Sequence, residues 1–160
     1  MHPNYNGKPR GDAWMTWDEL RDLVDMGWHI GAHTVTHPNL SELSLKDPEG
    51  HRIREELIQC DEEIEKELGI KPKAFAFTGT SFSTIALREV KTRYQFGRLW
   101  ITQAFYQVDG EKIRYADLVG IPGDDESDGG PPHQARYIYK DSNPYLLPSM
   151  EFQALIYDPN

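Results

Sequence analysis

Hydrophobic residues recur at helical spacing near the start of the chain. The apolar stripe within residues 16–26 consists of Trp17, Leu20, Leu23 and Val24. Thr16 and Glu19 have the spacing of a capping box, and Gly27 follows as a stop signal. This pattern predicts a helix over residues 16–26.

A second helical pattern covers residues 51–69 and ends at a glycine. Its apolar positions share one face and are Ile53, Leu57, Cys60, Ile64 and Leu68. The other positions are rich in glutamate, and we expect that acidic face to be solvated. Ser83 has the character of an N-cap and predicts a third helix that extends to about Tyr94.

Short apolar segments between and after these helices predict strands. The predicted strands are residues 28–32, 73–77, 98–102, 113–121 and, in the tail, 151–157. Residues 33–44 and 122–136 are predicted to be loops, because proline, glycine and small polar residues interrupt them. Helices that alternate with strands indicate an α/β fold with a parallel sheet. The sequence has no internal repeat and no linker, so we expect a single domain over residues 1–160.

The composition excludes several classes of function. The 160 residues contain 17 Lys plus Arg and 26 Asp plus Glu, which gives a formal net charge of −9. A chain this acidic is unsuited to binding nucleic acid or anionic membranes, because both attract cationic side chains. No apolar run reaches the roughly 20 residues that span a bilayer, and residues 1–14 lack the apolar region of a signal peptide. We therefore expect a cytoplasmic protein if the chain is complete.

Any metal site in this chain must be built from histidines and carboxylates, because the single cysteine, Cys60, excludes a cysteine-rich zinc module. His33 and His37 are the best candidates. They lie four residues apart in the loop after a predicted strand, where two imidazoles can turn toward one point and bind a divalent metal. Pro38 stiffens this segment. The alternative is that both histidines are ordinary polar loop residues.

The segment MTWDELRDLVDMGWHIGAHTVTHPNLSELS resembles the polysaccharide deacetylases of the fourth carbohydrate esterase family. In that family a helix of the type W-x-x-L-x-x-L-x-x-x-G leads into a strand and then into a His-Thr/Ser-x-x-His-Pro motif. The stretch HTVTHP matches that motif at every defined position. The resemblance continues through the acidic helix that ends in ELGI and the strand in KPKAFAFTGTSFS, and it covers about residues 15–80.

The resemblance implies a distorted, TIM-barrel-like (β/α) barrel and a divalent metal, usually zinc, held by one aspartate and two histidines. His33 and His37 match the two metal-binding histidines. The implied activity is that of a metal-dependent hydrolase that removes acetyl groups from an amino sugar or an acylated polysaccharide. In such a site the metal polarises the acetyl carbonyl and activates a water, and a carboxylate accepts the proton of that water.

Three motifs of the family are missing from this sequence. The Thr-Phe-Asp-Asp motif, which supplies the base and the carboxylate ligand in the family, has no counterpart in residues 1–14, so we expect this chain to lack the family's first βαβ portion. Residues 77–80 read Phe-Thr-Gly-Thr where the family carries an Arg-x-Pro or Tyr-Pro-x-Gly motif, and Leu-x-His is absent. Asp124 and Asp125 follow the apolar stretch LVGI and are the candidate replacement, one as metal ligand and the other as base. The alternative is a solvated acidic turn, and Asp12 is a second candidate ligand.

These departures leave two alternatives to an active deacetylase. One is a degenerate or truncated relative that binds metal or glycan without catalysis, and the other is an interaction module whose histidines are incidental. A barrel without its leading strands has an unpaired edge. We expect either a homo-oligomer that pairs this edge with another copy, or closure of the sheet by residues 113–121 or 151–157. In both cases we expect weak or absent deacetylase activity.

Overall fold

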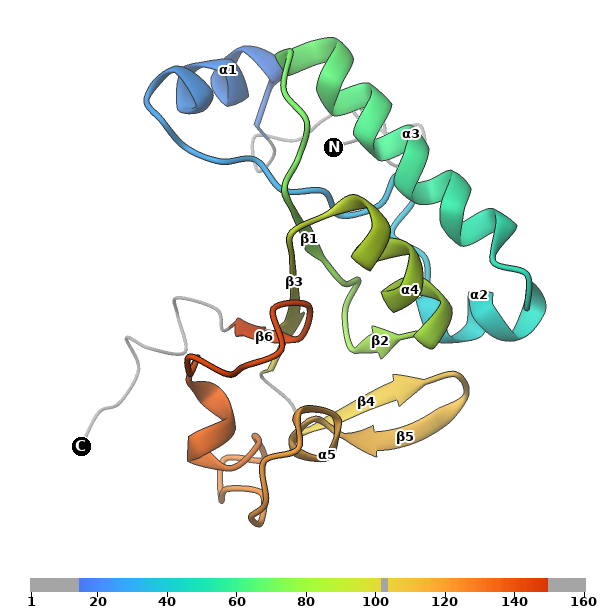
Figure 1. Cartoon of the computed structure of the whole chain (residues 1–160), viewed down its shortest axis with the longest axis vertical. Helices are drawn as coiled ribbons and strands as arrows, with labels where there is room; N and C mark the ends of the chain where they lie inside the picture. The colour runs from blue at the N-terminus through green and yellow to red at the C-terminus, as the bar shows by residue number, and fades with distance from the viewer. Residues whose placement is uncertain (1–14, 102–103, 150–160) are drawn as a thin grey trace.

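The computed structural model describes residues 15–101 and 104–149, which fold into a mixed α/β structure (Figure 1). Its helices are α1 (Trp17–Asp25), α2 (Leu40–Lys46), α3 (His51–Leu68), α4 (Thr84–Arg93) and α5 (Tyr115–Val119), followed by a 3-10 helix (His133–Arg136). Its strands are β1 (Ala74–Ala76), β2 (Ser81–Phe82), β3 (Phe96–Trp100), β4 (Phe105–Val108), β5 (Glu111–Arg114) and β6 (Leu147–Ser149).

The described strands form two small open sheets rather than a closed barrel. The first is parallel, with β3 between β1 and β6, and Phe75 of β1 lies opposite Gly97 of β3. In the second, β4 lies between β2 and β5; it runs parallel to β2 and antiparallel to β5. Figure 1 shows the first sheet at the centre of the molecule, with α1 and α3 above it and the β4–β5 hairpin below.

The first two predicted helices are confirmed to within one residue at each end. The capping box of α1 is formed in both directions: Thr16 Oγ1 accepts from the Glu19 backbone N–H at 3.1 Å, and the Glu19 carboxylate accepts from the Thr16 N–H. The helix therefore begins where its own side chains satisfy the free backbone donors. The third helix, α4, is also confirmed, since the Ser83 hydroxyl accepts from the N–H groups of Ile85 and Ala86.

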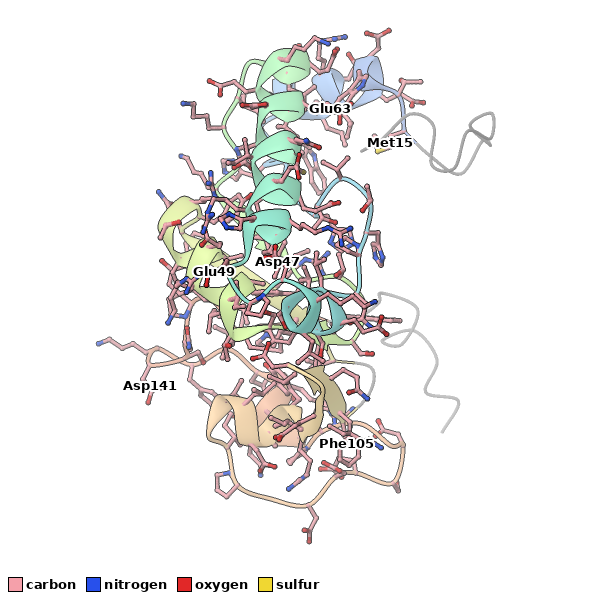
Figure 2. All side chains as sticks on the ribbon, turned by 90° about the vertical axis from the view of Figure 1, so that its right-hand side faces the viewer. Met15, Asp47, Glu49, Glu63, Phe105 and Asp141 are labelled. Carbon is pink, nitrogen blue, oxygen red and sulfur yellow. The ribbon has the colours of Figure 1, made fainter. Side chains whose placement is uncertain are left out.

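The long helix α3 is capped from outside, because Gly50 before it has no side chain. The carboxylate of Asp47 accepts from the Arg52 N–H at 2.7 Å and so caps this end of the helix. Figure 2 shows Asp47 and Glu49 at this end of α3 and Glu63 near the other end, beside α1.

The core lies between α3, the first sheet and α4. The buried residues of α3 are at most 4% exposed and are Ile53, Leu57, Cys60 and Ile64. They join a cluster with β1, in which Phe75 packs edge-on to Phe77 at 5.2 Å and stacks on Tyr94 at 5.3 Å between ring centroids. Burial raises the pKa of the Cys60 thiol, which makes this residue a small buried apolar group.

The structure corrects the strand predicted over residues 28–32. Only Ala32 pairs with β1, through a parallel bridge to Phe75. Residues 28–32 therefore pair with β1 at a single position. Trp28 is 65% exposed, so the apolar residues of this segment do not form a buried strand.

The loop predicted over residues 33–44 is also wrong in its second half, which forms the start of α2. The Asn39 side chain accepts from the Glu42 N–H at 3.0 Å and caps this helix. The capping spacing Asn-x-x-Glu is visible in the sequence, but Pro38 favoured a loop.

The strand predicted over residues 113–121 is wrong. The segment contains the end of β5 and then the helix α5, which is closed by Gly120 in the left-handed conformation. A helix of five residues is too short for its period to show, and the apolar residues in this stretch resembled a strand. This segment lies in the second sheet and does not close the first. Residues 151–157 lie outside the described part, and pairing with another copy stays a prediction that sedimentation would test.

The β4–β5 hairpin was not predicted. Asp109 and Gly110 form its two-residue turn, and both have positive φ, 48° and 92°. This is the conformation that an Asp-Gly pair favours in a hairpin turn. Among the described residues, no helix is long and apolar enough to cross a membrane.

Candidate functional site

The loop that carries the two candidate histidines connects the edge of the first sheet to α2. We refer to residues 33–39 as the histidine loop. Its starting point is fixed by Ala32, whose N–H donates to the Ala74 carbonyl at 2.8 Å and whose carbonyl accepts from the Ala76 N–H at 2.9 Å. His33 therefore emerges directly at the end of β1, in a position set by backbone hydrogen bonds.

The structure brings His33 and His37 together. Their ring centroids lie 4.9 Å apart, with the rings nearly perpendicular at 77°. The Nδ1 atom of His33 lies 2.8 Å from the Ala76 carbonyl oxygen. Because a carbonyl oxygen only accepts, Nδ1 must carry the proton in this contact, which leaves Nε2 of a neutral His33 with a free lone pair. This is the arrangement of a metal-ligating histidine, whose second nitrogen donates to a backbone carbonyl.

Electrostatics favour the neutral form of His33. The imidazole is exposed at its edge, but partial desolvation lowers its pKa, and the hydrogen bond to Ala76 opposes that effect only in part. The neighbouring His37 and Arg98 lower the pKa of His33 further, because a positive charge on His33 is unfavourable beside other cationic groups. Neutral imidazole is the form that can bind a metal.

Two residues of the histidine loop that are not glycine adopt the left-handed conformation. Thr34 has φ 65° and His37 has φ 57°, a conformation that costs about 1–2 kcal/mol for such residues. A hydrogen bond within the loop offsets part of this cost, because the Thr34 hydroxyl accepts from the His37 N–H at 3.1 Å. Strained residues persist only where the surroundings hold them.

Two hydroxyl groups after β1 hold the far end of the histidine loop. Thr78 Oγ1 donates to the Pro38 carbonyl at 2.6 Å, and Ser81 Oγ accepts from the Leu40 N–H at 3.0 Å. Both hydroxyls are buried. Sequence reasoning noted residues 77–80 only as a departure from the family motif, and nothing in the sequence indicated which carbonyl Thr78 would meet.

The structure does not bring Asp124 and Asp125 together with the two histidines. Both aspartates follow α5, so the strand-end placement that made them candidates is wrong. Asp125 accepts from Arg114 at 2.9 and 3.2 Å, and Asp124 is exposed. Across residues 15–101 and 104–149, no three His, Cys, Asp or Glu side chains cluster closely enough to hold a metal. Asp12 lies outside the described residues.

The other histidines of the described part lie elsewhere. His29 and His51 are exposed. The Nε2 atom of His133, the histidine in the second half of the chain, lies 2.9 Å from the Tyr137 hydroxyl. The site therefore rests on the pair His33 and His37.

Comparison with known proteins assigns the sequence to a family. The sequence model of the family described as "Polysaccharide deacetylase" matches residues 4–95, which is more than half of the chain. The chain belongs to the polysaccharide deacetylase family. The match includes the histidine loop and ends just before β3, and members of the family are generally metal-dependent.

The relatives that match are much longer than this chain. It is 36% identical over 82 residues to "Uncharacterized protein YlxY" of Bacillus subtilis (strain 168), which covers 51% of this chain and 24% of that protein. Among solved structures it is similar to BC0361, a polysaccharide deacetylase from Bacillus cereus, with a TM-score of 0.50 and 19% identity over 92% of this chain and 34% of that one. The Streptococcus pyogenes deacetylase PplD in complex with acetate matches with a TM-score of 0.47 and 21% identity, over 55% of this chain and 38% of that one. The similarity to BC0361 supports the α/β, partial-barrel fold predicted from the sequence.

Proposed function

We propose that this chain holds a divalent metal, zinc, through His33 and His37, and that it acts as a hydrolase on acetyl groups of an amino sugar or an acylated polysaccharide. The observation that carries the proposal is the histidine pair itself. The two rings lie 4.9 Å apart, and His33 donates from Nδ1 to Ala76, in a chain of the polysaccharide deacetylase family.

The donor set fits the proposed metal. Two neutral imidazoles are borderline ligands that suit zinc, and a catalytic zinc site combines such ligands with at least one open position. When bound, the metal supplies Lewis-acid polarisation of the acetyl carbonyl. The chain itself lowers the pKa of the His33 imidazole by partial desolvation and fixes its tautomer through Ala76, so that Nε2 is the atom left to bind.

The carboxylate of the site is the second part of the proposal. A metal ligand and a proton acceptor of this kind are needed for water to attack the acetyl group. The candidates are Asp12, Asp124 and Asp125. Asp125 would first have to leave Arg114, to which two of its hydrogen bonds are made. Zinc affinity measured on Asp12→Asn, Asp124→Asn and Asp125→Asn would identify which of them takes part.

Zinc content per chain tests the histidine assignment. The comparison uses wild type, His33→Ala, His37→Ala and the control His29→Ala, which removes an exposed histidine four residues before His33. We expect wild type and the control to bind about one zinc per chain, and the two loop variants to lose it. Equal, near-zero zinc content in all four proteins would contradict the proposal.

A second candidate function is a relative that binds metal or glycan without catalysis. The observation that favours it is the ion pair between Asp125 and Arg114. The Asp125 oxygen that binds the Arg114 guanidinium is then not free to bind a metal or to accept a proton from water. Release of acetate from a chromogenic acetyl ester or a chitin oligomer separates the two candidates. Turnover that disappears in His33→Ala supports the hydrolase, and zinc binding without turnover supports the second candidate.

A further inference from the structure

The carboxylate of Glu56, on α3, contacts the middle of the histidine loop. One oxygen, Oε2, accepts from the backbone N–H groups of Val35 and Thr36, each at 2.9 Å. The other oxygen, Oε1, accepts from the Thr36 hydroxyl at 2.6 Å. A single side chain, 20 residues away in the sequence, thus satisfies three donors of the loop.

These donors lie between the two strained residues of the loop. Val35 and Thr36 separate Thr34 from His37, the residues with positive φ. Successive backbone N–H groups that turn toward one anion form an anion-binding concavity, and here the anion belongs to the protein itself. The backbone of Val35 and Thr36 that directs both N–H groups at Glu56 leads directly into His37. The hydrogen bonds to Glu56 therefore also affect the direction in which His37 leaves the loop.

Helix α3 gives Glu56 a fixed position. Its neighbours Ile53 and Cys60, one turn before and after Glu56 on the same side of the helix, are buried in the core. A hollow of about 180 Å³ beside the loop is lined by Thr36, Pro38 and Glu56 among others. Water in this hollow can therefore replace the carboxylate at Thr36 when Glu56 is absent, and the loop then has other conformations available.

We propose that Glu56 is a positioning residue, which fixes the conformation of the histidine loop and thereby the spacing of the His33 and His37 imidazoles. The consequence for zinc affinity rests on the function proposed above, whereas the effect on the loop does not. Removal of a group that orients metal ligands lowers metal affinity about 10-fold to 100-fold in known sites. Glu56 acts through the loop and need not touch the metal.

The experiment compares wild type with Glu56→Ala, Glu56→Gln and the matched control Glu55→Ala. Glu55 is the adjacent residue of α3, is exposed and carries the same charge. Zinc affinity is measured by competition with a chromogenic chelator, and amide hydrogen exchange of Val35 and Thr36 is measured by NMR on the metal-free chain. Unfolding temperatures of all four proteins show whether the fold is retained.

We expect Glu56→Ala to bind zinc about 10-fold to 100-fold more weakly and to exchange both amides faster, with α3 and the core still folded. Glu56→Gln should recover part of both effects, because an amide oxygen still accepts while its NH2 group can donate to the Thr36 hydroxyl. Glu55→Ala should match wild type. Unchanged exchange at Val35 and Thr36 in Glu56→Ala would overturn the inference.

The two proposals fail in different ways. If wild type binds no zinc, the proposed function fails, and the exchange measurement alone decides whether Glu56 fixes the loop. If wild type binds zinc through His33 and His37 and Glu56→Ala binds it equally well, the positioning role is overturned while the proposed function stands.

Discussion

The histidine loop and the β4–β5 hairpin each contain two residues in the left-handed conformation, but they are held in different ways. In the hairpin the residues are Asp109 and Gly110, a pair that adopts this turn readily. In the histidine loop they are Thr34 and His37, for which the same conformation is unfavourable. The first turn is encoded by its own residues, whereas the second depends on groups that arrive from elsewhere in the fold.

The difference teaches where the stability of a site loop comes from. Glu56, Thr78 and Ser81 lie on α3 and in the segment after β1, and each bonds to a backbone group of the histidine loop or of the start of α2. The hairpin tip is also docked, since the Asp109 carboxylate accepts from Ser44 and Thr84. There, however, the contact anchors a turn that forms locally. In the histidine loop the contacts create the conformation.

The largest effect is expected from removing both hydroxyls that hold the end of the histidine loop. Thr78→Val together with Ser81→Ala leaves the Pro38 carbonyl and the Leu40 N–H without their partners. Each unpaired buried group costs about 1–3 kcal/mol, so we expect a loss of about 3 kcal/mol or more in the free energy of unfolding. Urea unfolding measures it. Thr92→Val, which removes an exposed hydroxyl of α4, is the control. A loss equal to that of the control would contradict the prediction.

The next effect concerns the hairpin. Asp109→Ala removes the acceptor of Ser44 and Thr84 and places alanine at a positive φ. We expect a loss of about 2–3 kcal/mol in the free energy of unfolding, from the lost hydrogen bonds to Ser44 and to Thr84 at the start of α4 and from the strain of a left-handed alanine. Zinc affinity should stay unchanged. A zinc affinity that falls along with stability would show that the hairpin and the histidine loop are coupled, which would contradict the view that they are held independently.

Helix α3 is braced to α4 by an ion pair, and this pair gives a prediction for pH. Arg54 donates to the nearly buried Glu89 at 2.9 and 3.2 Å. The Arg54 guanidinium holds the pKa of the Glu89 carboxyl below its usual range. A carboxyl whose pKa is lower in the folded state stabilises the fold above its unfolded pKa of about 4.3, and this contribution is lost as the pH falls through the folded pKa.

We therefore expect Glu89→Gln to be about 1–2 kcal/mol less stable than wild type near neutral pH. The difference between the two proteins should shrink as the pH falls below about 4. Urea unfolding at several pH values measures it, with the exposed Glu62→Gln as control. A difference that grows in acid would mean that the sign of the pKa shift is wrong.

The smallest effect on stability is expected at Thr34. Thr34→Gly relieves about 1–2 kcal/mol of left-handed strain but loses the bond to the His37 N–H and gives the unfolded chain more freedom. These effects nearly cancel, so the free energy of unfolding should change by less than about 1 kcal/mol. Zinc affinity should still fall, because His37 is less well fixed. A variant that binds zinc as well as wild type would show that Thr34 does not position this residue.

Helix caps and apolar stripes at helical spacing made much of the first half of the chain predictable. α1 and α4 have N-caps formed by adjacent residues, α3 has an apolar stripe that ends at Gly69, and the family motif HTVTHP is contiguous. The strand β2 has only two residues, so no alternation can reveal it, and β6 contains a proline, which argues against a strand. The Asp-Gly pair of the hairpin was readable and was missed, whereas the position of Asp125 beside Arg114 was not readable, because it depends on how α5 packs.

Glu56 shows where sequence reasoning stopped. It belongs to an acidic run that predicted a solvated helix face, and its neighbour Glu55 is solvated. Its spacing from Ile53 and Cys60 places it at the border of the apolar face, which was the available signal that it points toward the protein. What it would meet there could not be inferred from spacing.

The sequence alone determined the family, the α/β class and the three longer helices, and it singled out His33 and His37 as candidates, because caps, helical period and a contiguous motif act over a few residues. The tertiary structure decided which backbone groups hold the histidine loop, that Asp125 pairs with Arg114, and that Ala76 fixes the tautomer of His33. These contacts join residues far apart in the chain. They form only when α3 and β1 pack together, and their distances and directions are set by that packing rather than by any local pattern.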